Sequence, residues 1–490
     1  MTVAGTDAET IGQQAGRGLR WSLLGNVITK IGSFGMGLVL ARLLTPDDFG
    51  TYAVALAATQ FVMHVNDVGL IAATVQWRGR LSEMAATATT LAVGCSILIY
   101  VGFWFAAPVL AHVAQVPDAT PVIRLLTMVI IIDGITAVRT GALMREFRQD
   151  KLITANLVGL VVSAAVSISL AAAGAGAMSF ACGQVAAAVV IGVMVMAAAR
   201  MPFQLGLDRR VVRRLMRFGL PLAASLGIEA ILMNADYIII GHLVGVTLLG
   251  FYLLAFNISN WALSVISSAV RYVSVAGFSR LSEVDKEVLN QGVHRSVPLL
   301  VTGLAPIAVL TAALSDPLVA VLYGVEWLPA APVLQFLMML TVVRVLTAFA
   351  LDILMGAGAT RWTLWLNLCW AVVLIPALIY GTAHDAIRGA AIAHTVVGLV
   401  VAGPVTLFAL HRIGVRLAPI VPTLVRPVVA AGVAGAAAFG VVHLAYQHPV
   451  LALVLGGTLG AILYVLIAIP AARLRQVLAT VRREEAHAVQ

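Results

Sequence analysis

Charged side chains inside long apolar runs are the places where this sequence could do chemistry. They are Lys30, Asp67, Asp133, Arg139, Glu229, Asp236, Arg344 and Asp352. A charge in the middle of a bilayer costs about 2.5 to 3.5 kcal/mol on insertion scales, so such a residue is expected to face a cavity or to pair with an opposite charge. The cations could bind an anion, and the carboxylates could take up a proton or hold Na⁺. Structural ion pairs are the alternative for both groups.

The composition decides the class of protein that holds these charges. Of the 490 residues, 61% are hydrophobic and 11% charged, against about 25% charged in typical soluble domains. The polar start of the chain, with Asp7 and Glu9, does not predict a cleaved signal peptide. Cys95, Cys182 and Cys369 lie far apart in apolar runs, which predicts neither a disulfide framework nor a metal site. The sequence therefore predicts an all-α integral membrane protein.

The hydrophobic profile predicts about 14 membrane-spanning helices, since each bilayer crossing needs about 20 mostly apolar residues. The predicted spans are 19–44, 50–75, 84–112, 121–143, 152–173, 177–199, 214–242, 248–272, 293–322, 330–355, 362–381, 388–410, 424–445 and 450–471. Lys and Arg concentrate in alternate loops, most densely in residues 209–217. Because cytoplasmic loops carry the excess of these residues, both termini are predicted to be cytoplasmic. The net charge of +9 is thus assigned to topology rather than to nucleic acid.

The two halves of the chain resemble each other. The segment "VLARLLTPDDFGTYAVA" at 39–55 aligns with "IIGHLVGVTLLGFYLLA" at 239–255, and Gly50 and Gly250 show the constant offset of 200 residues. An even number of spans in each repeat predicts two parallel, pseudo-symmetric six-helix lobes. The expected division is an N-terminal lobe, a basic amphipathic cytoplasmic linker, a C-terminal lobe, and two extra helices with a basic cytoplasmic tail. These parts cover 1–199, 200–219, 220–416 and 417–490.

Several motifs carry a resemblance to a known family. They include "ARLLTPDDFGTYAVA", "NDVGL" from Asn66, "REFRQDK", "MNADYIIIGHLVGVTLLGFYLLA", "FSRLSE" and "YGVEWLPAAPVLQFL". Together they resemble the Wzx-type polysaccharide or oligosaccharide flippases, of the superfamily that also contains multidrug exporters and lipid II flippases. The resemblance implies two six-helix lobes around a central cavity, two additional C-terminal helices, and alternating access without ATP hydrolysis. The chain also lacks a G-x-x-x-x-G-K-[ST] phosphate loop.

The resemblance also implies a function in the bacterial inner membrane. It would be the transfer of a polyprenyl-pyrophosphate-linked oligosaccharide to the outer leaflet for surface polysaccharide synthesis. The pyrophosphate would need buried cations, for which Arg344, Arg139 and Lys30 are the candidates. Glu229, Asp133, Asp236 and Asp67 could couple transport to H⁺ or Na⁺, or could form salt bridges. Asp236 in "MNADYIII" and Asp67 in "NDVGL" match acids that recur in the family.

Other functions stay open at this point. An ion-coupled drug or metabolite exporter and a lipid II flippase would share the fold. A glycan-joining membrane enzyme is disfavoured, because the predicted outside loops are short, and no catalytic residue or cofactor is expected. The expected partners are the lipid-linked substrate, membrane lipids and a polysaccharide polymerase, but no nucleic acid. His64 and His394 lie in apolar runs, where a histidine satisfied within the bundle is favoured over a proton relay.

Overall fold

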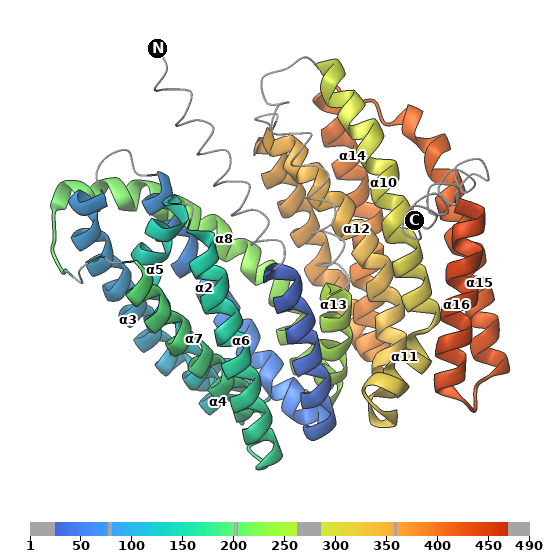
Figure 1. Ribbon diagram of the computed structural model, residues 1–490, viewed down its shortest axis with the longest axis horizontal. Helices are drawn as coiled ribbons and strands as arrows, with labels where there is room; N and C mark the ends of the chain where they lie inside the picture. Colours follow the sequence, from blue (N-terminus) through green and yellow to red (C-terminus); the bar gives the residue numbers. More distant parts are fainter. Residues whose placement is uncertain are drawn as a thin grey trace, which may run out of the picture. The chain divides into compact units, whose positions relative to one another are not determined.

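The described residues of this computed structural model form helices joined by short loops (Figure 1). These residues are 25–76, 81–146, 148–199, 201, 204–261, 286–356 and 360–468, and no strand occurs among them. An α-helix pairs the backbone N–H and C=O groups of its interior within its own segment, as a bilayer requires of lipid-exposed elements. The all-α class predicted from the composition is confirmed.

The helices follow the predicted apolar segments closely. In chain order they are a helix at 25–43, α2 (Pro46–Gln76), α3 (Leu81–Val113), α4 (Ala119–Thr127), α5 (Val129–Arg145), α6 (Gln149–Ala172), α7 (Met178–Ala198), α8 (Arg209–Val244), a helix at Val246–Trp261, α10 (Lys286–Ala313), α11 (Ser315–Leu322), the 3₁₀-helix Val325–Ala330, α12 (Ala331–Gly356), α13 (Thr360–Val397), the π-helix Gly398–Ala402, α14 (Gly403–Arg412), the 3₁₀-helix Ala418–Ile420, α15 (Val421–Leu444) and α16 (Pro449–Ala468). Within the described ranges, nine helices are long and apolar enough to cross a membrane. The total number of spans stays a prediction.

A break inside α13 separates two predicted spans. Asp385 (φ −141°, ψ 37°) and Ala386 (φ 44°, ψ −133°) are not helical. The break falls between the spans predicted at 362–381 and 388–410. A positive φ is uncommon for alanine, so the chain turns sharply here between two helices.

The chain divides into two compact units. The first unit comprises Met1–Leu254 with Thr382–Ile387, and the second comprises Ala255–Gly381 with Arg388–Gln490. This grouping does not test the lobe boundaries predicted from the sequence, which stay a prediction.

In the first unit, helices pack in pairs along small residues. Helix 25–43 lies against α6, where Gly25 meets Ile153 and Gly32 meets Leu160. Helix α6 packs along α7, and α2 packs along α8. Glycines permit this close approach because they carry no side chain.

The two copies of the repeated motif meet each other in this unit. A Cβ atom on Gly50 would overlap the carbonyl oxygen of Val246, and a Cβ atom on Gly250 would overlap that of Pro46. Each glycine thus packs against the backbone of the other copy, at positions related by the same offset of 200 residues. The start of α2 and the start of helix Val246–Trp261 form a reciprocal contact that any larger residue would disrupt.

Polar groups reinforce this reciprocal contact. The Thr247 hydroxyl donates a hydrogen bond to the carboxylate of Asp47, again across an offset of 200 residues. Both residues are exposed, and each lies in the first turn of its helix, at a position that the predicted topology places outside the cytoplasm. The same end of the unit holds a contact between the His242 ring Nδ1 and the Val113 carbonyl oxygen, at 2.7 Å.

Asp48 ties the beginning of α2 to the beginning of α7. Its Oδ2 accepts from the Thr45 backbone N–H at 3.0 Å and from the Thr45 hydroxyl at 2.8 Å. The Thr45 hydroxyl oxygen accepts from the Asp48 N–H at 3.3 Å, which completes a reciprocal helix cap. Asp48 Oδ1 accepts from the Ala177 N–H at 3.1 Å.

Substituting Asp48 tests how much this helix cap contributes to the stability of the protein. Asp48→Ala is expected to destabilise the protein by about 1 to 2 kcal/mol, because it removes a helix cap and leaves the Ala177 N–H without its acceptor. The measurement is the apparent melting temperature in detergent. Asp118→Ala is the matched control, since Asp118 precedes α4 without making a side-chain cap. Equal melting temperatures for the two variants would contradict this account.

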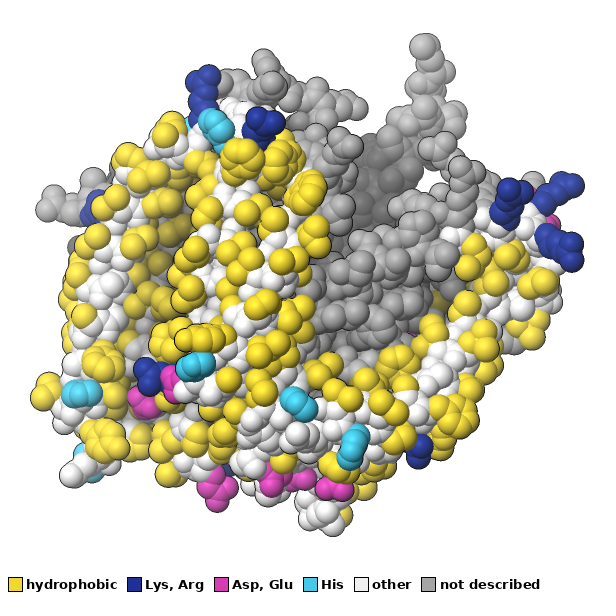
Figure 2. Space-filling model, turned by 180° about the vertical axis from the view of Figure 1, so that it is seen from behind, with side chains coloured by type: hydrophobic (Ala, Val, Ile, Leu, Met, Phe, Trp, Pro, Cys, Tyr) yellow, Lys and Arg dark blue, Asp and Glu magenta, His cyan; other side chains and the backbone are white. Residues whose placement is uncertain are grey.

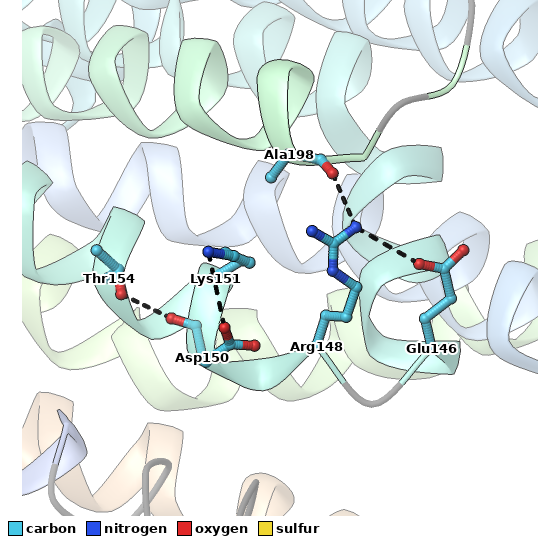
Figure 3. A network of polar contacts seen from close by, with 6 residues as sticks. All are labelled: Glu146, Arg148, Asp150, Lys151, Thr154 and Ala198. Atoms are coloured by element: carbon cyan, nitrogen blue, oxygen red, sulfur yellow. Dashed lines mark hydrogen bonds and ion pairs between the residues drawn. The ribbon is translucent and has the colours of Figure 1, made fainter. Parts of the chain in front are cut away.

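A small polar network closes the turn between α5 and α6 (Figure 3). Arg148 Nη1 donates to the Ala198 carbonyl oxygen at the end of α7, at 2.9 Å, and lies 3.7 Å from Glu146 Oε2. Lys151 and Asp150 form a second pair at 3.9 Å. These ion pairs are largely exposed, and such pairs contribute about 1 kcal/mol or less. The contact that holds the α5–α6 turn against α7 is the hydrogen bond from Arg148 to Ala198.

The basic linker predicted at 200–219 is partly helical. Helix α8 begins at Arg209 and continues into the predicted span, with the Arg210 N–H donating to Asp208 Oδ1 at 2.7 Å. The preceding residues attach to α3, because the Gly206 N–H donates to the Thr90 hydroxyl at 3.0 Å and the Asp208 N–H to the Thr87 hydroxyl at 3.1 Å.

In the second unit, α10 packs against α12 and α15, and α15 packs along α16. Gly435 of α15 approaches Val309 of α10, and Gly456 and Gly460 of α16 approach Leu314 and Leu310. Large hydrophobic side chains are exposed along α13, α15 and α16. Figure 2 shows hydrophobic side chains over much of the visible described surface, with charged side chains few. This distribution fits helices whose outer faces meet lipid.

Candidate functional site

Arg344 lies in the interior of α12 and is partly exposed. Its Nη1 donates a hydrogen bond to Asn260 Oδ1 at 2.9 Å. Its guanidinium carbon lies 5.4 Å from the ring centroid of Phe256, within the range of a cation–π contact. Arg344 is thus a cation in an apolar span. Asn260 and Phe256 orient its side chain, and the residue is not fully buried.

The helix that supplies Asn260 and Phe256 is fixed to α12 by a buried pair of hydroxyl groups. The Ser259 hydroxyl lies 2.6 Å from the Thr341 hydroxyl, and both residues are almost completely buried. The Thr341 hydroxyl also donates to the Leu337 carbonyl oxygen at 2.9 Å. Thr341 is one turn before Arg344, so this contact holds the guanidinium beside its two partners.

His394 lies in the second half of α13 and is 7% exposed. Its ring meets the Trp370 ring edge-on, with a centroid distance of 6.4 Å. The Nδ1 atom of His394 and the Nε1 atom of Trp370 are buried, and neither has a hydrogen-bond partner among the described residues. The sequence favoured a histidine satisfied within the bundle, and for Nδ1 the structure shows that this prediction is wrong.

Arg139 occupies a different environment, in α5 of the first unit. It is 2% exposed, and its Nη1 donates to the Ile135 carbonyl oxygen of its own helix at 3.3 Å. The neighbouring Gly134 lets α5 approach Ser96 of α3 closely. A side chain this buried can reach a ligand only after the surrounding helices move. Lys30, also in the first unit, is exposed on helix 25–43.

The four acidic candidates differ in how they are held. Asp236, at the end of α8, is 1% exposed and accepts a hydrogen bond from the Tyr252 hydroxyl at 3.0 Å. Tyr252 belongs to the repeated motif, and its counterpart Tyr52 accepts a hydrogen bond from Gln184. Asp133 in α5 is half-buried. The side chains of Glu229 and Asp67 lie outside the described residues.

An apolar cavity in the second unit was not predicted from the sequence. It has a volume of about 400 Å³ and is lined by residues of α10, α12 and α15. Gln335, Phe336 and Met339 line it from α12, while Gly432 and Gly435 leave room on α15. The small residues of α15 were the available signal, but small residues in membrane helices more often mark close packing. Helix α12 therefore carries both a wall of this cavity and Arg344.

The described helices define a multi-pass α-helical membrane protein. Among solved structures, the fold is similar to that of a lipid II flippase, MurJ, in an inward closed conformation. The TM-score is 0.78, with 10% sequence identity, and the match covers 94% of this chain and 99% of that one. A multidrug resistance MATE family transporter in an inward-facing conformation matches with a TM-score of 0.64 and 16% identity, over 79% of this chain and 94% of its own.

The family follows from the sequence comparisons. The family described as polysaccharide biosynthesis protein matches residues 39–332. The chain is 25% identical over 395 residues to the succinoglycan biosynthesis transport protein ExoT of Rhizobium meliloti (strain 1021), covering 80% of this chain and 78% of ExoT. It is 22% identical over 342 residues to the teichuronic acid biosynthesis protein TuaB of Bacillus subtilis (strain 168), covering 69% and 70%. The chain belongs to this polysaccharide biosynthesis family, and the predicted membership of the Wzx-type flippases is confirmed.

Proposed function

We propose that this protein is a flippase that moves a polyprenyl-diphosphate-linked oligosaccharide from the cytoplasmic to the outer leaflet by alternating access. The observation that carries the proposal is the placement of two features on α12. Phe336 and Met339 line an apolar cavity, and Arg344, a partly exposed residue, follows one to two turns later. A substrate with an apolar chain joined to a diphosphate needs these two environments close together.

The cavity supplies the environment for the polyprenyl chain. Its volume of about 400 Å³ falls within the range of small-molecule pockets, and its lining is almost entirely apolar. Arg344 supplies the environment for the diphosphate, since a guanidinium can form two parallel hydrogen bonds to phosphate oxygens. Asn260 holds Arg344 from one side through its Oδ1 atom, and its amide NH₂ can donate a hydrogen bond to a phosphate oxygen.

Lys30 and Arg139 are proposed as further cations for the diphosphate. Lys30 is exposed, whereas Arg139 would contact substrate only in a conformation that opens α5. Asp133, Asp236, Glu229 and Asp67 remain proposed sites of H⁺ or Na⁺ coupling or of salt bridges. The protein would act in the bacterial inner membrane with both termini in the cytoplasm, without enzymatic activity or a bound cofactor, and would deliver its product to a polysaccharide polymerase.

The names of the relatives support this reading over the alternatives. ExoT is named as a succinoglycan transport protein, TuaB for teichuronic acid synthesis, and WzxC of Escherichia coli (strain K12) for lipopolysaccharide synthesis. Drug or metabolite export and lipid II flipping remain the second candidates, because the MATE and MurJ structures share the fold.

Complementation separates these functions. Expressed in strains that lack their own polysaccharide flippase, the protein is expected to restore surface glycan in at least one host. The measurement is the amount of cell-surface polysaccharide at matched protein levels, with empty vector as the control. Failure in hosts with several repeat-unit structures, together with lowered drug accumulation, would replace the flippase with an exporter.

A further inference from the structure

His394 is a buried base that the proposed function has not yet used. It is 7% exposed, and its Nδ1 makes no hydrogen bond within the part of the chain that the structure describes. An unsatisfied buried polar atom costs about 1 to 3 kcal/mol, so such atoms in native proteins call for an explanation. The Trp370 ring contacts the His394 ring edge-on and holds it away from solvent.

The backbone around His394 brings it to the helix of Arg344. The Thr395 hydroxyl donates to the Phe336 carbonyl oxygen of α12 at 2.9 Å. Gly398 packs against Leu340 and Val343, the residue immediately before Arg344. The segment from Gly398 to Ala402 is a π-helix, a rare local geometry that is frequent at functional sites.

One turn of helix separates His394 from Gly398, which packs against Val343, so His394 and Arg344 lie on helices that pack against each other. Arg388 belongs to the same segment as His394, and its guanidinium is placed 5.9 Å from the Phe336 ring centroid. Trp370, which contacts the ring from the other half of α13, carries no ionisable group. An imidazolium this deeply buried, on a helix that packs against the one carrying Arg344, is unfavourable through desolvation and through repulsion between the two positive charges.

A diphosphate at Arg344 would reverse this electrostatic balance, because it brings more negative charge than the guanidinium neutralises. We propose that His394 is the proton-accepting residue of the anion site, neutral while the site is empty and protonated when a diphosphate occupies Arg344. This inference rests on the proposed function. It adds that the protein takes up a proton when the substrate binds. His394 acts through its positive charge, which offsets part of the negative charge of the diphosphate, and it does not need to touch the substrate.

Proton uptake on binding tests the assignment. Farnesyl diphosphate is titrated calorimetrically into the full-length protein in detergent, in two buffers of different ionisation enthalpy near pH 7. The intact protein is expected to take up about half a proton to one proton more than His394→Gln. Between about pH 6 and pH 8, its Kd is expected to rise about 10-fold more than that of the variant, which corresponds to about 1.4 kcal/mol. Protonation of the ligand itself is common to both proteins and cancels.

The controls separate His394 from the anion site as a whole. Trp370→Phe keeps the ring contact and is expected to keep the proton uptake, and His394→Asn is measured in parallel so that the result does not depend on one variant's folding. Equal proton uptake by the intact protein and both His394 variants would overturn the role of His394. It would not contradict the anion site at Arg344. Absence of binding to any of these proteins would instead overturn the proposed function.

Inorganic pyrophosphate distinguishes a lipid headgroup from a free anion. It is expected to cause the same proton uptake as farnesyl diphosphate but to bind at least about 10-fold more weakly, because it leaves the apolar cavity empty. Equal affinity for the two ligands would show that the site recognises a free anion, and the assignment to a lipid headgroup would fall.

Discussion

Arg344→Ala is expected to weaken binding of a polyprenyl diphosphate by about 10- to 100-fold and to reduce surface glycan to a corresponding degree. Hydrogen bonds to charged groups contribute about 1.5 to 3 kcal/mol, and each 1.4 kcal/mol is a factor of 10 in affinity. The structure makes Arg344 the first choice among the cations. It is only partly covered and is oriented by Asn260 and Phe256, whereas Arg139 is 2% exposed.

Arg412→Ala is the matched control for this loss. Arg412 also lies over a phenylalanine, with its guanidinium carbon 5.8 Å from the Phe408 centroid, but it is exposed at the end of α14. Removing it should leave binding and glycan unchanged. Arg344→Lys should retain part of the affinity, because lysine keeps the charge but not the planar pair of donors. If Arg344→Ala and Arg412→Ala behaved alike in both measurements, the anion site would have to be placed elsewhere.

Joining Asp47 to Thr247 is expected to stop transport almost completely. These residues belong to the two copies of the repeated motif and are hydrogen-bonded across the offset of 200 residues. In the predicted topology they lie outside the cytoplasm, one from each predicted lobe. Alternating access requires the lobes to separate on that side, so a short covalent link there should hold the protein closed.

The test uses Asp47→Cys with Thr247→Cys in a background without Cys95, Cys182 and Cys369, the three native cysteines. A short thiol-specific crosslinker should abolish glycan export, and a reductant that cleaves the link should restore it. The control pair is Trp104→Cys with Arg124→Cys, whose positions are also in contact but lie within one predicted lobe. Full export by the crosslinked Asp47–Thr247 pair would exclude an opening at this contact.

The helices could be predicted from the sequence because burial of apolar side chains in lipid sets their length and position. The boundary between the spans at 362–381 and 388–410 was placed correctly, since Asp385 and Ala386 break α13 there. The repeat was visible as matching residues in the two halves of the sequence, but these matches could not show that the two copies of the motif are in contact. That contact depends on the missing side chains of Gly50 and Gly250, each of which leaves room for the backbone of the other copy.

The site was less predictable, because sequence gives residue type and depth but not environment. The sequence predicts both Arg344 and Arg139 to be cations in apolar spans, yet Arg344 is partly exposed and Arg139 is buried. The missing hydrogen bond of His394 depends on which side chains surround its ring. The cavity depends on three helices that are separated along the chain and meet only in the fold.

Direct measurement of lipid movement tests the central claim most closely. The purified protein is reconstituted into liposomes that carry a polyprenyl-diphosphate-linked oligosaccharide, and a membrane-impermeant glycosidase reports how much of the glycan lies in the outer leaflet. The account predicts that nearly all of the glycan becomes accessible with the intact protein, and only about half with Arg344→Ala or with protein-free liposomes. Accessibility no higher than in protein-free liposomes, for a protein that folds and binds the lipid, would contradict the assignment as a flippase.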